Sequence, residues 1–74
     1  MELELRGEFI QLDNLLKAMD LVASGAEAKQ QILAGLVKAN GEVETRIRRK
    51  LRAGDSVEFG GQQINVIAKS ELNG

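Results

Sequence analysis

The spacing of the apolar residues differs between the first and second halves of this chain, and the difference restricts the folds that the chain can adopt. The first part repeats apolar side chains at the i, i+3, i+4, i+7 spacing of an amphipathic helix, at Leu12, Leu15, Leu16 and Met19. After about residue 36, apolar and polar residues alternate, as in strands with one buried face. Because a helix pair cannot bury its apolar stripe alone, the strands must supply a second layer. The sequence therefore predicts an α+β fold, with two helices on a small antiparallel sheet.

The ends of the two predicted helices are marked by particular residues. Residues 3–6 (LELR) alternate as in a short strand, and Asp13 then lies in the first turn of a helix, where a carboxylate suits the positive end of the dipole. Ser24 and Glu27 form a capping box that starts the second helix, and Gly35 ends it in a left-handed conformation. The buried side of this helix is predicted to consist of Ala28, Ile32, Leu33 and Leu36.

The remaining residues are predicted to form strands and tight turns. Residues 36–39 (LVKA) lead into an Asn-Gly turn, and residues 42–51 (EVETRIRRKL) follow as extended chain. Residues 56–59 and 62–68 form a second hairpin around two glycines. We expect one domain over residues 1–70, and a frayed tail over residues 71–74.

The composition removes several classes of function. The chain has no Cys and no His, which excludes disulfides, Cys/His zinc sites and imidazole catalysis. Carboxylate pairs such as Glu42 and Glu44 are interpreted as solvated, because nothing indicates a pocket that would shift their pKa. No apolar run approaches the roughly 18 residues of a membrane span, and the acidic start is unlike a signal peptide. We therefore expect a soluble, cytoplasmic, non-catalytic domain without metal or cofactor.

The charges are segregated along a chain whose net charge is only −1. Residues 1–28 have six acids and two bases, whereas residues 29–52 have seven bases and two acids. Residues 53–74 are acidic again, with three acids and one base. This pattern indicates one positive face directed at an anionic partner. The alternative is a solvated surface with local charge pairing.

Half of the ten cations lie in seven residues, at Arg46, Arg48, Arg49, Lys50 and Arg52. In an extended strand, the four at even positions would share one face, roughly 6.6 Å apart. Such a row of like charges repels itself unless an anion relieves it. Arg49 interrupts the opposite, apolar face, so the strand is expected to be imperfect or to curl there. The cations that could extend the patch are Lys17, Lys29 and Lys38.

The residue types in this cluster favour phosphate. Arginine binds phosphate through a planar fork of N–H donors. The chain has no Trp or Tyr, and its two aromatic residues, Phe9 and Phe59, are predicted to be in the core. The chain therefore has too few aromatic side chains to form a platform on which single-stranded bases stack. The remaining mode is recognition of the backbone and shape of the nucleic acid, which suits folded RNA.

The segments LDNLL, SGAEAKQQILAGLVKANGEVETR and AGDSVEF, in this order, resemble the S4-type RNA-binding domain, and in particular the short, stand-alone bacterial members of its YbcJ-like branch. The match covers residues 9–59 and extends more loosely to residue 68. The resemblance implies a two-helix αL-type motif and an RNA-binding surface made by the second helix, the following strand and adjoining loops. The site residues that it implies are Lys29, Lys38 and Arg46, with Arg48, Arg49, Lys50 and Arg52 as a local enrichment.

Two positions depart from the family pattern. The family commonly has Arg before the first helix and after the Ser that opens the second, where this chain has Gln11 and Gly25. The cluster at residues 46–52 is a candidate to compensate for these two missing arginines, because it would place the basic patch at a different part of the surface. We therefore expect a monomeric protein that binds structured RNA, with ribosomal and transfer RNA as candidates. The alternative is an adaptor whose basic face docks on an acidic protein.

Overall fold

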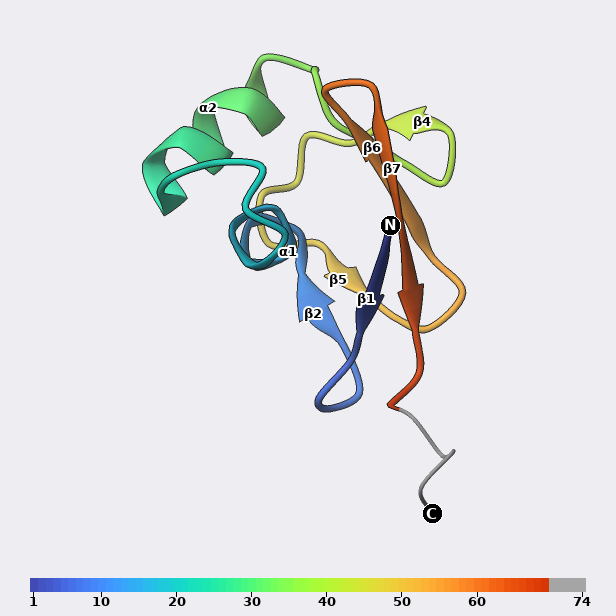
Figure 1. Cartoon of the computed structure of the whole chain (residues 1–74). Helices are drawn as coiled ribbons and strands as arrows, with labels where there is room; N and C mark the ends of the chain where they lie inside the picture. Colours follow the sequence, from blue (N-terminus) through green and yellow to red (C-terminus); the bar gives the residue numbers. More distant parts are fainter. Residues whose placement is uncertain (70–74) are drawn as a thin grey trace.

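The computed structural model describes residues 1–69, and the predicted tail at 71–74 lies outside the described residues. Figure 1 shows two short helices beside a twisted sheet. The elements are β1 (Glu2–Glu4), β2 (Ile10–Gln11), α1 (Leu12–Ala18), α2 (Gly25–Leu33), β3 (Lys38–Ala39), β4 (Glu42–Val43), β5 (Lys50–Leu51), β6 (Ser56–Phe59) and β7 (Gln62–Ile67). The α+β class predicted from the sequence is confirmed.

The strands form two sheets. The larger has the order β1-β7-β6-β3-β4, and the smaller pairs β2 with β5. The prediction of a wholly antiparallel sheet is wrong for one strand, since β1 lies parallel to β7. A parallel neighbour requires a long connection, and here both helices and five strands separate β1 from β7 along the chain.

The predicted ends of α2 are confirmed. The Ser24 Oγ accepts a hydrogen bond from the Glu27 N–H at 3.1 Å. The Glu27 carboxylate accepts one at 2.6 Å from the Ala23 N–H, one residue before the N–H expected of a capping box. Gly35 has a φ of +78°, and the Leu36 N–H donates to the Gln31 carbonyl. This is the Schellman arrangement for ending a helix.

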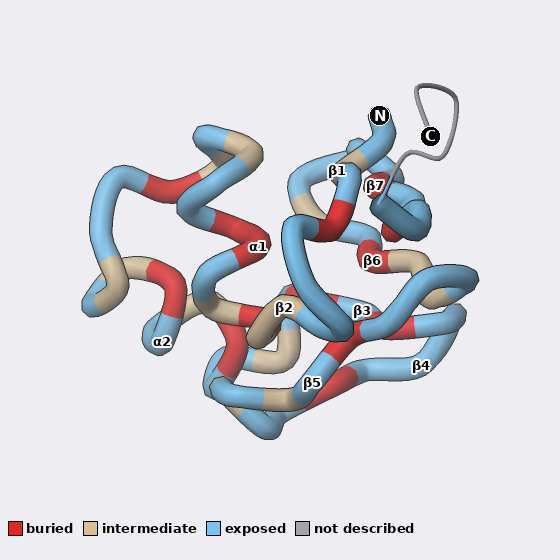
Figure 2. Tube along the Cα trace, turned by 90° about the horizontal axis from the view of Figure 1, so that it is seen from below, coloured by how far each residue is buried: buried red, intermediate tan, exposed pale blue. Residues whose placement is uncertain are grey.

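The core lies between the helices and the larger sheet (Figure 2). Its largest fully buried side chains are Leu12, Leu15, Leu16, Ile32, Leu51, Ile64, Val37, Val57 and Val66. Ala28 and Ile32 are buried as predicted, whereas Leu33 and Leu36 are 56% and 59% exposed, so their predicted burial is wrong. Leu36 lies beyond the turn at Gly35, where the chain leaves the helix, and the next residue, Val37, enters the core in its place.

Residues 42–51 do not form a continuous strand, and the irregularity expected around Arg49 is confirmed. The chain leaves the larger sheet after β4, turns at residues 47–48, and joins the smaller sheet at β5. The Arg49 N–H donates to the Arg46 carbonyl across this turn, at 3.3 Å. The four cations at even positions therefore do not stand in one straight row. We call residues 44–49 the arginine loop.

Candidate nucleic-acid interface

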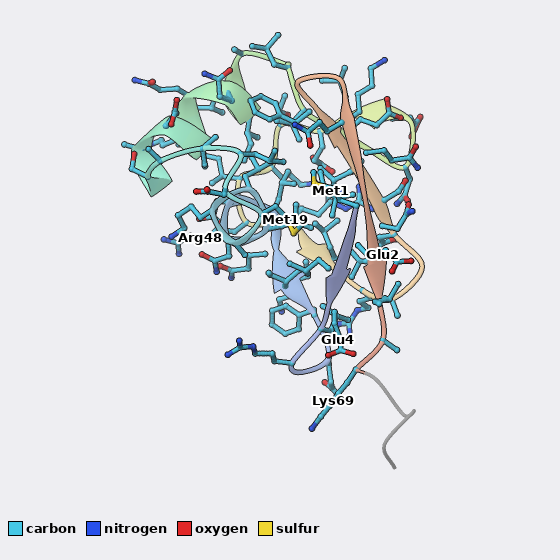
Figure 3. The ribbon with its side chains drawn as sticks, viewed as in Figure 1. Met1, Glu2, Glu4, Met19, Arg48 and Lys69 are labelled. Carbon is cyan, nitrogen blue, oxygen red and sulfur yellow. The ribbon has the colours of Figure 1, made fainter. Side chains whose placement is uncertain are left out.

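The arginine loop is attached to the start of α1. The Leu12 N–H donates to the Arg49 carbonyl at 2.9 Å, and the Asp13 N–H donates to the Ile47 carbonyl at 3.1 Å. The first N–H groups of a helix have no partner within it, so they are available to hold a neighbouring segment. Ile47 also packs, partly buried, against the core. These contacts fix the loop backbone, so that Arg48 projects outward beside the helices (Figure 3).

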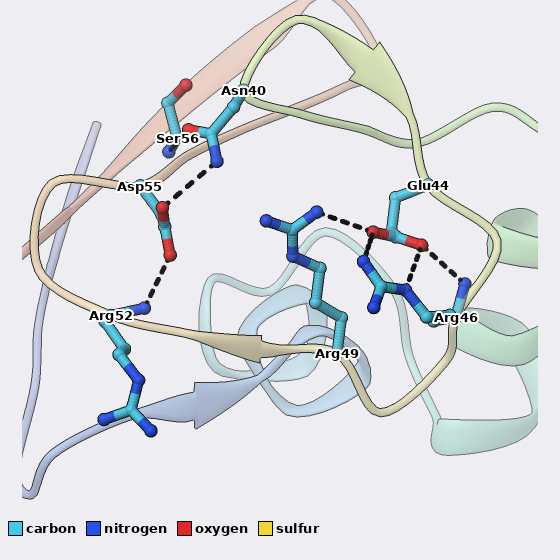
Figure 4. Close-up of polar contacts among 7 residues, drawn as sticks. All are labelled: Asn40, Glu44, Arg46, Arg49, Arg52, Asp55 and Ser56. Carbon is cyan, nitrogen blue, oxygen red and sulfur yellow. Dashed lines mark hydrogen bonds and ion pairs between the residues drawn. The ribbon is translucent and has the colours of Figure 1, made fainter.

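A buried carboxylate organises two of the arginines (Figure 4). Glu44 is only 6% exposed, so its interpretation as a solvated carboxylate is wrong. It accepts hydrogen bonds from the Arg46 backbone N–H, Nε and Nη2 at 2.9, 3.1 and 3.0 Å, and from the Arg49 Nη1 at 2.7 Å. The Arg46 side-chain hydrogen bonds, against the opposing effect of burial and with help from Arg49, lower the pKa of Glu44 to about 2.

Each arginine keeps donors for another partner. A guanidinium has five N–H donors, and the hydrogen bonds to Glu44 use two from Arg46 and one from Arg49. The Arg46 side chain is 72% exposed and that of Arg49 is 28% exposed. Glu44 therefore orients both groups without covering them.

Two hollows lie side by side on this face of the molecule. One, of about 580 Å³, is lined by Arg46, Arg48, Arg49 and Lys50. The other, of about 500 Å³, is lined by Asp13, Gly25, Ala26, Lys29, Ile47 and Arg48. Because Arg48 belongs to both, the start of α2 and the arginine loop share one continuous surface.

The two positions that depart from the family pattern both border this surface. Gln11 pairs with Lys50 across β2 and β5. Gly25 lines the second hollow, and a Cβ placed on it would lie 3.8 Å from the Lys17 Nζ. Each position that lacks the family's arginine therefore has a lysine beside it.

The β2–β5 pair extends the surface toward Phe9. Its inner face carries Ile10 and the fully buried Leu51, so the neighbouring positions face outward. The Lys50 Nζ lies 4.9 Å from the centre of the Phe9 ring, and the Arg52 Cζ lies 5.7 Å from it. Phe9 is 38% exposed, so its predicted place in the core is wrong. Because successive side chains of a strand point to opposite faces, Ile10 faces inward and Phe9 faces outward.

Arg52 precedes a loop that is tied to the β3–β4 turn (Figure 4). The Asp55 carboxylate accepts hydrogen bonds from the Arg52 N–H at 2.7 Å and from the Asn40 Nδ2 at 3.1 Å. The Asn40 Oδ1 in turn accepts one from the Ser56 N–H. The Arg52 N–H, followed by the smaller effects of Asn40, Arg49 and the Arg52 charge, lowers the pKa of Asp55 despite its partial burial.

The structure brings together six of the seven predicted site residues, which we call the basic surface: Lys29, Arg46, Arg48, Arg49, Lys50 and Arg52. Lys38 lies elsewhere. It is opposite Val43 and Glu58 in the sheet and lines a separate hollow with Leu36 and residues 58–61. Sequence reasoning missed the roles of Glu44 and Phe9. The one feature of the sequence that could have indicated the role of Glu44 is that this acidic residue lies within the most basic segment.

Within residues 1–69, no group of His, Cys, Asp and Glu could hold a metal ion. In the same part of the chain, no helix is long and apolar enough to span a membrane.

Comparison with known proteins points to one family. The model of the S4 domain matches residues 3–67. The protein "Putative RNA-binding protein YbcJ" of Escherichia coli (strain K12) is 46% identical over 59 residues, which cover 80% of this chain and 84% of that protein. The "Uncharacterized protein YbcJ" of Shigella flexneri matches with the same identity and coverage.

A solved structure agrees with this assignment. The solution structure of YbcJ from E. coli, described as revealing an αL motif involved in RNA-binding, superposes with a TM-score of 0.70 at 41% sequence identity. The superposition covers 90% of this chain and 86% of YbcJ. The agreement in sequence and fold extends over the elements that carry the basic surface, and the chain belongs to the S4 domain family.

Proposed function

We propose that this chain is a monomeric, non-catalytic RNA-binding protein that recognises structured RNA through the basic surface, with ribosomal and transfer RNA as candidates. The observation that carries the proposal is the continuity of two cation-lined hollows on a chain with a net charge of −1. Membership of the S4 domain family and the RNA-binding motif described for YbcJ support it. A cytoplasmic location belongs to the proposal, because such RNAs act there.

The chemistry of the surface suits a folded phosphate backbone. Arg46 and Arg49 present guanidinium groups that Glu44 holds in place, and Arg48 stands between the two hollows. Oriented guanidinium groups can contact phosphate oxygens in pairs. Phosphate contacts fix the position and register of a protein on its nucleic acid, but they carry no sequence information directly. The proposal is therefore recognition of RNA shape.

The test removes two cations from the basic surface and compares the result with a matched control. The test variant is Lys29→Gln with Arg48→Gln, both exposed. The control variant is Lys38→Gln with Lys69→Gln, which makes the same change in net charge at exposed positions outside the basic surface. Binding to a folded RNA such as a transfer RNA is measured over a range of salt concentrations.

We expect the test variant to bind more weakly, with the slope of log affinity against log salt reduced by roughly one per lost phosphate contact. The control variant should retain most of the affinity, and Lys38 is expected to contribute less than the resemblance implies. Circular dichroism should be unchanged for both, because exposed substitutions usually alter stability by at most about 0.5 kcal/mol. Equal RNA binding by the folded test variant and the parent would contradict the proposal.

A further inference from the structure

Next to the basic surface lies a cavity that the proposed phosphate contacts do not use. It has a volume of about 480 Å³, and the residues that matter for its chemistry are Leu3, Glu4, Arg6, Phe9, Asn14 and Ala18. Its size falls within the roughly 300–1,000 Å³ of typical small-molecule sites. Glu4, one of its lining residues, lies at the lower end of the molecule in Figure 3, away from Arg48. Because Phe9 lines the cavity and lies near Lys50 and Arg52, the cavity adjoins the basic surface at its Phe9 end.

The lining of this cavity combines apolar wall with hydrogen-bonding groups that match the edges of a base. Leu3 and Ala18 contribute apolar wall, and Phe9 contributes an exposed aromatic ring. The Glu4 carboxylate would repel a phosphate, whereas it could accept a hydrogen bond from the amino group of a base. Asn14 and Arg6 offer further hydrogen-bonding groups for the edges of a base.

Phe9 connects the cavity to the cations. Its ring lies within reach of the Lys50 ammonium and the Arg52 guanidinium, at 4.9 and 5.7 Å. Lys50 also lines the hollow of the arginine loop. A nucleotide whose base contacts Phe9 would thus have its phosphate near Lys50 and Arg52, in continuity with the phosphates on the rest of the surface.

We infer that this cavity receives one unpaired nucleobase, from a bulge or loop of the RNA whose backbone lies on the basic surface. The inference rests on the proposed function and adds base recognition to it. One exposed aromatic residue cannot support a run of stacked bases, but it is sufficient for a single base that leaves its helix. Stacking on an aromatic side chain stabilises such a base and tolerates any sequence, because every base has a π-face.

The experiment compares two RNA stems that differ only in one base. Both have a single bulged nucleotide, placed at successive positions along the stem, and in one of them the bulged base is removed to leave an abasic ribose. The proteins are the parent, Phe9→Leu, and the control Phe59→Leu, whose ring is partly buried against the core and lines a different hollow. Thermal melts establish that each variant is folded.

The parent should bind the stem with the bulged base about tenfold more tightly than the abasic stem at the best position. Phe9→Leu should bind both stems equally, at the parent's affinity for the abasic stem, and Phe59→Leu should keep the preference. Because Phe9 and Phe59 are the only aromatic residues, NMR of ¹³C-labelled protein can follow each ring separately. The Phe9 signals should shift upfield with the bulged base present, and the Phe59 signals should not.

The outcomes separate this inference from the proposed function. Equal affinity of the parent for both stems, or an undiminished preference in a folded Phe9→Leu variant, would overturn the base site while leaving phosphate recognition intact. Failure of the parent to bind either stem would overturn both. The variant that lacks the Lys29 and Arg48 charges should weaken binding to both stems equally and leave their ratio unchanged.

Discussion

Glu44 is an acidic residue in the most basic segment of the chain, and the directions of two arginines depend on it. Its carboxylate accepts four hydrogen bonds from Arg46 and Arg49 while almost fully buried. Leaving a buried charge without its partner is costly. The carboxylate and its arginines are therefore expected to act as one unit in stabilising the arginine loop.

This unit predicts how stability depends on pH. The pKa of Glu44 is lowered from 4.5 to about 2 in the folded protein, so its ionisation favours the folded state. That stabilisation is complete above about pH 4.5 and is lost as the pH falls toward 2. A shift of this size corresponds to at most roughly 3–4 kcal/mol. Asp55, whose pKa is also lowered, acts in the same direction. Urea denaturation at a series of pH values measures the change.

The control for this prediction is Glu44→Gln, which keeps the size of the side chain and removes its charge. It should be less stable than the parent at pH 7, and its stability should depend less on pH between 4.5 and 2. If the parent and Glu44→Gln lose stability in parallel over this range, the buried carboxylate is not the source of the acid sensitivity.

At the scale of single elements, α2 is the part that sequence patterns described best. Ser24, Glu27 and Gly35 act through their own side chains or backbone within a few residues, so the start and end of the helix could be predicted from local chemistry. The arginine loop could not, because its path depends on Ile47 reaching the core and on the first N–H groups of α1 donating to the loop carbonyls. Those partners are distant in sequence.

The first turn of α2 provides a prediction about RNA affinity. Gly25 has no positive φ, and a Cβ there would meet only the Lys17 Nζ at 3.8 Å, an ordinary contact. Gly25→Arg should therefore fold, and it should add a cation to the hollow that Lys29 and Arg48 line. We expect tighter binding to structured RNA by about 1 kcal/mol, with a steeper salt dependence.

Asp13 lines the same hollow as Gly25, and pairing with it would reduce the gain from a new arginine. The control Gly25→Gln separates charge from side-chain bulk, because Gln is long and neutral. A salt titration of RNA binding for the parent and both variants provides the measurement. Weaker binding by a folded Gly25→Arg variant would instead indicate that RNA approaches the backbone closely at this glycine.

Across the whole molecule, the fold gathers charge that is already segregated along the sequence. The segment at residues 29–52 is basic and its neighbours are acidic, and the fold places six of its seven cations on one surface. The class of fold and most of the residues that form the basic surface could therefore be predicted from the sequence. The parallel placement of β1 and the exposure of Phe9 could not, since both depend on contacts between distant segments.

Binding at such a surface should stabilise the entire domain. A ligand that binds only the folded state contributes about 2.7 kcal/mol when its concentration is one hundred times its Kd. In a domain of this size, that corresponds to a rise in Tm of about 10 °C or more. Melts followed by circular dichroism, with the RNA signal subtracted, should show this rise at low salt and lose it at high salt. An unchanged Tm at saturating RNA would contradict binding to the folded state.

The pairing of β1 with β7 also sets an order of events during synthesis on the ribosome. The amino group of Met1 donates to the carbonyl of Gln63, 62 residues later, and the Leu5 N–H donates to the Ile67 carbonyl. Synthesis starts at the N-terminus, so β1 emerges before its partner strand exists. Pairs this distant in sequence also form slowly, because a long loop must close first. β1 thus waits for its neighbour until nearly all of the described chain has been translated.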